Sequence, residues 1–421
     1  MSRYLTVALL VTLPFCQRLL AADWPSFRGP YGNGLTTESQ LPTTWGPDQH
    51  VRWKAPLPRP GNGSPIVSHG RVFVTSAEDD KGHRRSLYCF DRHSGKQQWV
   101  RTVDYNRDEE THETNPYCGT TPAADGKHVV VWHGSAGLFC YDFAGELQWE
   151  KQFGEFQHIW GYGTSPVLYG DRVIMHCSPG AKVFVTALEL SSGRVLWTAE
   201  EPMAGDGTYR PDKKYMGSWT TPIVASIGGR DQIICAMPTR VVAYDPADGK
   251  ILWFCEGLSG PKGDLAYSSP VIAGNVCVSV GGFNGPGMAF KLGGKGNLTA
   301  SDRLWRNETN PQSIGTGIVL DGRLYRPNAG PGTIQCVVPE TGEIVWTSPR
   351  EVGEMWSSIS YAAGKAYVTN RKGITTVFRP NPDKFELLAQ NDLGEASHAT
   401  PALSDGQIFL RTNQHLYCIG E

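Results

Sequence analysis

The chain contains a repeated unit of four short apolar runs, separated by glycine or aspartate turns, in which the last run ends in tryptophan. One copy reads Leu-Tyr-Cys-Phe-Asp at residues 87–91, turns at Gly95 and ends at Trp99. A unit of this kind buries its faces only against neighbouring copies, so the repeat determines the architecture of the whole chain. The repeat tryptophans, which we expect to be structural core residues, are Trp53, Trp99, Trp149, Trp197, Trp253, Trp305 and Trp346.

Each unit opens on Ser-Pro or Thr-Pro, or on a diverged form of it, and these openings lie 42 to 57 residues apart. Each unit holds four runs of strand length that are rich in Val and Ile, and no run is long enough for a helix. The sequence therefore predicts an all-β, eight-bladed propeller of four-stranded antiparallel blades. The openings contain Ser64, Thr121, Ser165, Thr221, Ser269, Thr316, the pair Ser357-Ser358, and Thr400.

The last unit is incomplete, because it begins at Thr400 and the chain ends at Glu421 after three strands. Its missing tryptophan-bearing strand is found near the N-terminus, at residues 51–54 (Val-Arg-Trp-Lys). A ring closed by strands from both chain ends has no free sheet edge. We therefore expect residues 50–421 to form the propeller and residues 23–49 to form an N-terminal extension.

The pattern Leu-Tyr-Cys/Ala-Phe-Asp-x-x-Ser/Thr-Gly-x-x-x-Trp resembles the tryptophan-docking repeat of quinoprotein-type, or PQQ-like repeat, eight-bladed propellers. That group includes quinoprotein alcohol dehydrogenases and BamB-like outer-membrane assembly propellers. Residues 23–30 (Asp-Trp-Pro-Ser-Phe-Arg-Gly-Pro) also resemble the opening of secreted bacterial PQQ-like repeat proteins. The resemblance covers nearly the whole mature chain and is specific for the fold, whereas it leaves the activity open.

The N-terminal segment is typical of a secretory signal peptide. Arg3 is followed by an apolar run at residues 5–15 and by Ala21-Ala22, which predicts cleavage after residue 22 and export to the periplasm or the medium. The apolar run is too short to span a membrane. A lipoprotein anchor at Cys16 is disfavoured because the bulky Phe15 precedes it. The net charge of −2 does not indicate a protein that binds nucleic acid through excess positive charge.

Nine cysteines remain after the predicted cleavage. Four occupy one third-strand position that other units fill with alanine or valine, so we expect them to be buried and unpaired: Cys89, Cys140, Cys336 and Cys418. Second-strand cysteines receive the same interpretation: Cys177, Cys235 and Cys277. Cys118 lies in a connecting segment and is the expected exposed thiol. The chain has no Cys-x-x-Cys pair, so no metal site is predicted.

The two faces of the ring differ in loop length. The turns between the first and second strands and between the third and fourth strands are tight glycine turns with little room for a site. The connections between blades are longer, and the first (about residues 103–118) and third (about residues 200–218) stand out. The first contains three acids at residues 108–110, which we expect to be solvated. Function usually lies in long loops on a rigid scaffold.

Aromatic and polar residues precede the innermost strands, which line the channel, so we expect them to gather around one mouth. This set is Tyr117, Trp160, Tyr162, Trp219, Tyr267, Trp356 and His398. Loops between the second and third strands add His133, Arg326, Asn328, Arg371, Arg411 and Asn413. Such a mouth suits a sugar, a planar ligand or a peptide. The alternative, weighted equally, is that these aromatics only fill gaps between blades.

Enzymatic motifs are scarce: the chain has no P-loop, no His-Glu-x-x-His and no Gly-x-Ser-x-Gly. A quinoprotein dehydrogenase implies adjacent cysteines, an aspartate base and calcium held by carboxylate and amide oxygens, and the chain has no Cys-Cys pair. The leading hypothesis is a secreted, non-catalytic, monomeric propeller scaffold that binds a protein or a carbohydrate at the channel mouth, with no cofactor. The alternatives are an oxidoreductase that uses pyrroloquinoline quinone (PQQ) with calcium, and an outer-membrane assembly scaffold.

Overall fold

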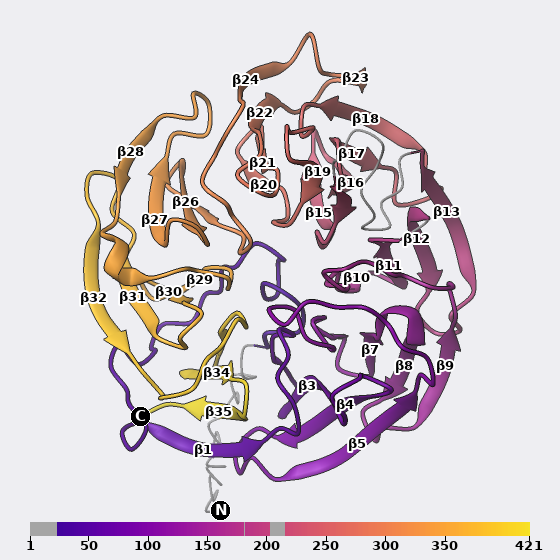
Figure 1. Ribbon diagram of the computed structural model, residues 1–421, viewed down its shortest axis with the longest axis vertical. Coiled ribbons are helices and arrows are strands. Elements are labelled where there is room, and N and C mark those ends of the chain that lie inside the picture. The colour runs from indigo at the N-terminus through magenta and orange to yellow at the C-terminus, as the bar shows by residue number, and fades with distance from the viewer. Residues whose placement is uncertain (1–22, 181, 203–214) are drawn as a thin grey trace, which may run out of the picture.

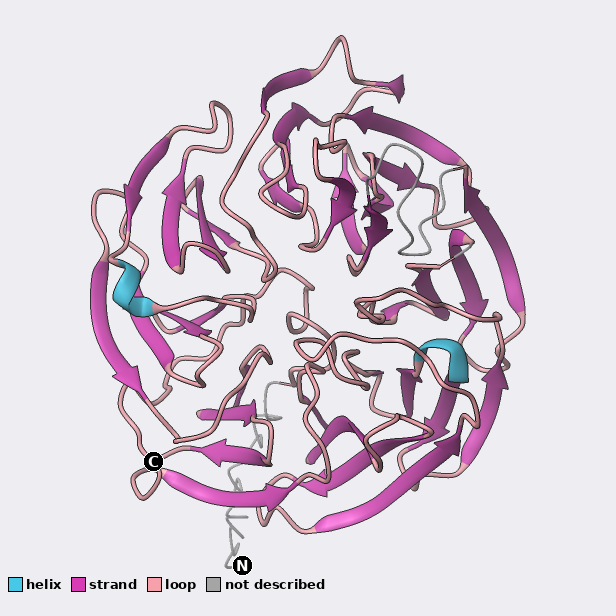
Figure 2. Ribbon diagram, viewed as in Figure 1, coloured by secondary structure: helices cyan, strands magenta, loops and turns pink. Residues whose placement is uncertain are grey.

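The computed structural model describes residues 23–180, 182–202 and 215–421, and the predicted signal segment lies outside them. Eight sheets are arranged as blades around a central axis, as predicted from the repeat (Figure 1). The described helices are two short 3-10 turns, Gly134–Ala136 and Arg350–Val352, and almost everything else is strand or loop (Figure 2). No helix among the described residues is long and apolar enough to cross a membrane.

Blades are numbered here in chain order, and their strands are lettered A to D from the axis to the rim. Blade 1 contains β2 (Ile66–Ser68), β3 (Arg71–Ala77), β4 (Arg84–Asp91) and β5 (Gln97–Asp104). Blade 2 contains β6 (Ala123–Ala124), β7 (His128–Trp132), β8 (Leu138–Asp142) and β9 (Leu147–Lys151). Blade 3 contains β10 (Val167–Tyr169), β11 (Arg172–Cys177), β12 (Val183–Glu189) and β13 (Val195–Glu201). Blade 4 contains β15 (Ile223–Ile227), β16 (Arg230–Ala236), β17 (Arg240–Tyr244) and β18 (Ile251–Glu256).

The remaining blades repeat this order. Blade 5 contains β20 (Val271–Ala273), β21 (Val276–Val280), β22 (Gly287–Lys291) and β24 (Arg303–Asn307). Blade 6 contains β25 (Ile318–Leu320), β26 (Arg323–Asn328), β27 (Thr333–Val337) and β28 (Ile344–Thr347). Blade 7 contains β29 (Ser360–Ala362), β30 (Lys365–Thr369), β31 (Thr375–Arg379) and β32 (Glu386–Asn391). Blade 8 contains β33 (Ala402–Ser404), β34 (Gln407–Arg411), β35 (His415–Ile419) and β1 (Val51–Pro56).

Blade 8 closes the ring with strands from both ends of the chain. Its strand order is β1-β35-β34-β33, and Trp53 pairs with Cys418 in the antiparallel β1–β35 ladder. Figure 1 shows the indigo β1 beside the yellow β35 at the rim. The predicted N-terminal closing strand is therefore confirmed.

The repeat tryptophans explain the spacing of the unit. Each lies on a D strand opposite the small third-strand residue, as with Trp99 opposite Cys89. Six indole N–H groups donate to a backbone carbonyl of the next blade, as Trp149 does to Leu190 at 2.7 Å. The glycine of the next C–D turn lies against the ring: a Cβ on Gly95 would come within 2.5 Å of Trp53. Trp253 instead bonds Gln232 of its own blade.

Three features depart from the regular repeat. Blade 7 has Ala389 opposite Val377 where other blades have tryptophan. A short strand, β23 (Gly296–Asn297), pairs in parallel with the outer strand β18 of blade 4 and covers its edge. The connections that lead into blades 4 and 5 are joined by the parallel pair β14 (Tyr215–Ser218) and β19 (Gly263–Ala266). The sequence pattern predicts neither pair.

The N-terminal extension lies across the face that carries the A–B turns. Trp24 and Val67 exchange two backbone hydrogen bonds of 2.9 Å, which ties the extension to blade 1. The backbone N–H of Tyr361 donates to the Gly34 carbonyl at 2.8 Å, which ties it to blade 7. Figure 1 shows this indigo segment crossing the centre of the ring towards β29. We call residues 23–36 the strap.

The expectation for Cys118 is wrong, whereas the seven cysteines predicted to be buried are buried. The side chain of Cys118 is fully buried, and burial raises the pKa of its thiol to about 11. Its connecting segment turns inward because the Cys118 carbonyl accepts hydrogen bonds from Gly63 and from the Thr75 hydroxyl. All nine cysteines among the described residues are buried and unpaired.

Candidate functional site

The Ser-Pro and Thr-Pro openings meet around the axis in a ring of hydrogen bonds. At seven of the eight blade junctions, the backbone N–H of one opening donates to the hydroxyl of the next at 2.9 to 3.1 Å. At the junction of blades 4 and 5, the Ser269 hydroxyl instead donates to the Thr221 carbonyl at 2.8 Å. We call these eight residues the hydroxyl ring; they are Ser64, Thr121, Ser165, Thr221, Ser269, Thr316, Ser358 and Thr400.

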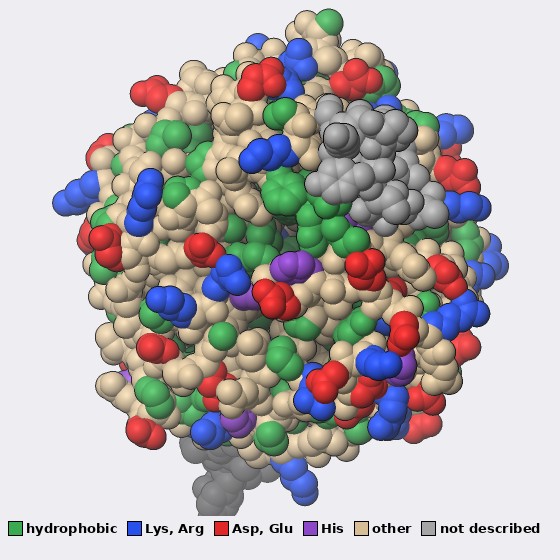
Figure 3. All heavy atoms as spheres, viewed as in Figure 1, with side chains coloured by type: hydrophobic (Ala, Val, Ile, Leu, Met, Phe, Trp, Pro, Cys, Tyr) green, Lys and Arg blue, Asp and Glu red, His purple; other side chains and the backbone are tan. Residues whose placement is uncertain are grey.

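A cavity of about 420 Å³ descends from the face with the D–A connections to the hydroxyl ring. All eight ring residues line it, and Phe27 of the strap lies among the lining residues as well. Figure 3 shows hydrophobic and histidine side chains gathered around a hollow at the centre of this face. The volume is in the ~300–1,000 Å³ range typical of small-ligand pockets. We call it the mouth cavity.

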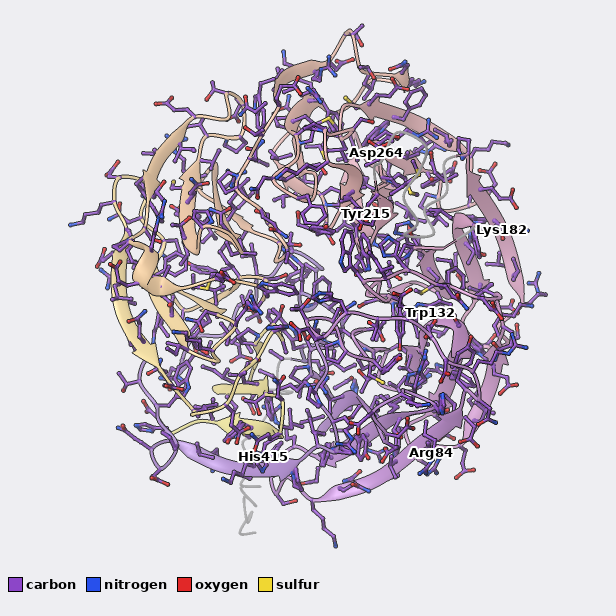
Figure 4. The ribbon with its side chains drawn as sticks, viewed as in Figure 1. Arg84, Trp132, Lys182, Tyr215, Asp264 and His415 are labelled. Atoms are coloured by element: carbon purple, nitrogen blue, oxygen red, sulfur yellow. The ribbon has the colours of Figure 1, made fainter. Side chains whose placement is uncertain are left out.

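One side of the mouth cavity is an aromatic wall delivered by the D–A connections that lead into blades 3 to 5 and by the B–C loop of blade 5. Trp160 packs against Phe283 with ring centroids 5.0 Å apart, and Trp219 packs against Tyr267 at 5.3 Å. Tyr215, labelled in Figure 4 near the centre of the ring, lies 4.8 Å from Trp160 between ring centroids. Edge-to-face contacts of this kind hold the rings in fixed orientations.

The opposite side is formed by Trp356 and His398, whose rings are stacked with centroids 4.6 Å apart. The His398 Nδ1 lies 3.1 Å from the Thr114 carbonyl, which can only accept, so Nδ1 must carry the proton. Burial, and secondly the nearby charge of Arg371, lower the pKa of His398 to about 4. At neutral pH the ring is therefore uncharged, and Nε2 is a free acceptor. Arg371 lies over Trp356 at 5.3 Å, outside the cavity lining.

Two amides brace this polar side. Asn62 donates to the Thr114 carbonyl at 2.9 Å and to Asn115 Oδ1 at 3.0 Å. Asn115 in turn donates to the carbonyls of Trp160 and Tyr162, at 2.7 and 3.0 Å. The brace links the polar side to the aromatic wall, so both sides are held in one geometry.

Two predicted mouth residues, Tyr117 and Tyr162, instead surround a buried ion pair. The Arg85 guanidinium bonds the Glu109 carboxylate with both side chains almost fully buried, and the Tyr117 and Tyr162 rings lie 5.2 and 5.3 Å from it. The Arg85 charge must be compensated where it is buried, which draws Glu109 inward. The expectation of a solvated acidic run is therefore wrong for Glu109.

The predicted B–C loop residues are also placed away from the cavity. Arg326 bonds Gln335 inside blade 6, and Asn328 bonds Ser313 and Thr333. Arg411 lies beneath the first blade's opening, where it donates to the carbonyls of Gly63 and Arg59. Both His133 ring nitrogens are buried, and burial lowers the pKa of His133 to about 3. Asn413 does not line the cavity. Of the predicted site residues, the structure brings together Trp160, Trp219, Tyr267, Trp356 and His398.

The described lining of the mouth cavity contains no Asp, Glu, Lys or Arg, and its titratable groups are His112, His398 and the Tyr267 phenol. Burial raises the pKa of Tyr267, so the phenol stays neutral. No group of three or more metal-ligating side chains occurs among the described residues. Calcium is bound by several oxygen ligands, usually with carboxylates among them, and the carboxylates of PQQ are bound most strongly by cationic side chains. The residues that the structure describes here do not fit PQQ with calcium.

The fold and its docked tryptophans define a PQQ-like repeat propeller. A family model described as outer membrane protein assembly factor BamB matches residues 36–111 and 85–348, more than half of the chain, and the chain belongs to this family. No curated protein sequence matches it.

Solved structures share this architecture at low sequence identity. A europium-containing methanol dehydrogenase is 12% identical, with a TM-score of 0.68 over 95% of this chain and 98% of that one. A quinohemoprotein alcohol dehydrogenase from Comamonas testosteroni is 14% identical, with a TM-score of 0.68 over 95% and 81%. BamB from Moraxella catarrhalis is 13% identical, with a TM-score of 0.57 over 88% and 97%. At these identities the likeness shows the fold alone.

Several lining residues have no marker in the repeat. Asn62 and Asn115 sit in connections of irregular length, and Phe283 and Gln312 lie in B–C and D–A segments whose sequence follows no pattern. Asn62 is the exception that could have been found, because it lies two residues before a Ser-Pro opening. Phe27 reaches the site only through the tertiary path of the strap.

Proposed function

We propose that this protein is an exported, non-catalytic propeller that binds a neutral carbohydrate in the mouth cavity. The observation that carries the proposal is the described lining, which contains no Asp, Glu, Lys or Arg and in which an aromatic wall faces hydroxyl and imidazole groups. Sugar rings present apolar C–H faces and a rim of hydroxyls. Aromatic side chains cover the former, and neutral polar groups bond the latter.

The indole N–H groups support a binding role. Within the described structure, the Nε1 groups of all seven repeat tryptophans donate hydrogen bonds to protein atoms. Trp219 donates to the Gly161 carbonyl at 2.8 Å. Trp160 and Trp356 have no such acceptor among the described residues, so their N–H groups are available to a ligand. Together with the His398 acceptor, they give one donor on each side of the cavity and one acceptor.

The hydroxyl ring supplies the polar base of the same site. Seven of its hydroxyls accept a backbone N–H, and a hydroxyl can donate as well as accept. A sugar hydroxyl that enters the cavity therefore meets groups able to play either role. No charged partner is required, which favours a neutral ligand over an acidic one.

A quinone-dependent oxidoreductase is the less favoured function because the described lining lacks cations and carboxylates. Addition of PQQ with calcium to the purified protein should change neither the quinone absorbance nor the melting temperature. Saturable binding would favour the oxidoreductase. A protein-assembly role is suggested by the family description.

The proposal is tested on an array of neutral and acidic glycans, with wild-type protein and the Trp160→Ala variant. We expect wild-type protein to bind neutral glycans, and Trp160→Ala to lose about 1–3 kcal/mol of binding free energy, as for other buried aromatic contacts. Asn413→Ala, away from the cavity, is the matched control. Absence of neutral-glycan binding, or equal binding by both proteins, would refute the proposal.

A further inference from the structure

Among the described lining residues of the mouth cavity, Phe27 is the one that comes from outside the repeats. It also lines a second pocket of about 280 Å³, which opens on the face crossed by the strap. Thr221 and Ser269 line both spaces as well, so the two meet at the junction of blades 4 and 5. Phe27 therefore lies between the mouth cavity on the axis and a lower pocket formed by the strap and the inner strands of blades 3 and 4.

The strap holds Phe27 in place from both sides. Before it, the Trp24 bridge to Val67 and a 2.8 Å bond from the Ala124 N–H to the Pro25 carbonyl tie the strap to blades 1 and 2. After it, Arg28 donates to the Gly317 carbonyl of blade 6 at 2.7 Å.

The Arg28 anchor is unusual because the guanidinium is buried and bonds only carbonyls. Its other acceptors are the carbonyls of Gly32 and Asn33, so three carbonyls bond Nε and Nη2, whereas the buried Nη1 has no partner among the described residues. Burial without a carboxylate partner lowers the pKa of Arg28, because desolvation disfavours the charged form. Arg28 also has a left-handed backbone, with φ of 64°. Such a backbone conformation persists only where the surrounding structure fixes it. The position of Phe27 is therefore enforced by its neighbours.

We propose that Phe27 is a specificity-determining residue that closes the inner end of the mouth cavity, so that the site recognises the end of a neutral glycan chain. We call the cavity closed in this way the blind cup. This inference rests on the carbohydrate function proposed above. A chain that passed through the ring would collide with Phe27. A chain that lay across the mouth would leave the hydroxyl ring and Phe27 without contacts. Only a terminal unit can reach both.

The position of Phe27 is tested without any sugar, by thiol accessibility. All nine cysteines among the described residues are buried, so an introduced thiol can be followed above a low background. In Phe27→Cys, we expect N-ethylmaleimide to react, and a maleimide held on a carrier protein by a short linker to react at least about tenfold more slowly than with Tyr31→Cys. Tyr31 lies on the same strap and its side chain is 65% exposed. Equal rates with the carrier reagent would overturn this position of Phe27.

The recognition of chain ends is tested on an array of neutral glycans that share interior units and differ in their terminal unit, with free oligosaccharides as competitors. We expect the affinity of wild-type protein to depend on the identity of the terminal unit. We expect Phe27→Ala to bind about tenfold more weakly, as for a lost aromatic contact. Tyr31→Ala should bind as wild type. Phe27→Leu, which keeps an apolar side chain at this position, should retain most of the affinity.

The outcomes separate the two proposals. Binding that follows interior units, or that is unchanged in Phe27→Ala, overturns the blind cup and leaves the carbohydrate function standing. Failure of every neutral glycan to bind overturns the carbohydrate function and with it the chain-end specificity, whereas the thiol rates still decide whether Phe27 lies between the two cavities. Melting curves of Phe27→Ala show whether the strap stays docked.

Discussion

The molecule uses tryptophan in two regions with opposite surroundings. On the D strands, each repeat tryptophan donates its indole N–H to the protein, mostly to the next blade, and six of the seven are tied to a neighbour in this way. At the mouth, Trp160 and Trp356 line a cavity and donate to no described acceptor. The indole N–H groups of the repeat tryptophans are all hydrogen-bonded within the fold, whereas at the mouth Trp219 donates to the Gly161 carbonyl and Trp160 and Trp356 have no described acceptor. Position in the repeat, and not residue type, distinguishes a structural tryptophan from a candidate binding residue.

The strongest test of the structural group is removal of the closing strand. Deletion of residues 23–57 takes away β1 with Trp53 and exposes the edge of β35. We expect this variant to lose cooperative unfolding or to aggregate, because a propeller with an open edge has lost one blade's outer strand. Thermal denaturation followed by circular dichroism checks this. A melt like that of the parent protein would contradict the closed ring.

A single repeat tryptophan should have a smaller but still large effect. Trp149 is 8% exposed and its N–H bonds the Leu190 carbonyl, so Trp149→Ala leaves a cavity and an unsatisfied carbonyl. We expect a loss of about 3–5 kcal/mol in the free energy of unfolding, measured in urea. Trp149→Phe should recover part of it. A loss of unfolding free energy that is smaller in Trp149→Ala than in Trp356→Ala would contradict the distinction between the two regions.

Acid should weaken the blades through a buried histidine. The Nδ1 of His176 lies 2.9 Å from the Thr220 carbonyl, and burial lowers the pKa of His176 to about 4. The unfolded chain binds this proton near pH 6.5 and the folded protein does not, so stability should fall as the pH falls from 6.5 to 4, by up to about 2–3 kcal/mol.

Urea unfolding at pH 7 and pH 4.5 measures this loss, and His176→Gln should flatten the dependence. An unchanged slope in that variant would assign the effect to other groups. The pKa values of His133 and His398 are also lowered by burial, so these two histidines are the next candidates.

The mouth tryptophans should affect binding and leave stability nearly intact. Trp356→Ala removes a ring that contacts His398 and Arg371 at the surface of the cavity. We expect binding of a neutral glycan to weaken by about 1–3 kcal/mol, with a shift in melting temperature smaller than that of Trp149→Ala. Calorimetric titration and differential scanning calorimetry give the two numbers. Loss of stability with unchanged binding would indicate that Trp356 fills a gap between blades and does not contact the ligand.

The smallest expected effect is the absence of a reaction. Cys118, like the other described cysteines, is buried, and its thiol pKa is raised to about 11. Native protein should therefore resist iodoacetamide at pH 7.5, and urea-unfolded protein should react fully, as read by mass spectrometry. Rapid native modification of Cys118 would show that the first D–A connection opens.

The fold could be predicted from the sequence because the same strand pattern recurs in several units of the repeat. The position of Trp53 relative to Cys418 follows from the register of the other units, and so does the closing strand. The mouth residues were found where the same register places them, just before an A strand, as with Trp219 and Tyr267. Local pattern was sufficient for these residues.

The rest of the site depends on contacts that no pattern encodes. Tyr162 lies one residue before the position that Trp219 has in its unit and turns towards Arg85, because a buried charge collects aromatic and acidic partners. Arg411 is a strand-end residue whose guanidinium is used to bond carbonyls beneath blade 1. Phe27 enters the axis from the other end of the chain. Each is decided by tertiary packing rather than by local sequence.

The most direct test of the account compares Trp149→Ala and Trp356→Ala side by side with wild-type protein on the neutral-glycan array, at a temperature at which all three are folded. We predict that Trp149→Ala binds the same glycans as wild type and that Trp356→Ala loses most of the signal. Loss of binding in Trp149→Ala with full binding in Trp356→Ala would contradict the division between structural and binding tryptophans.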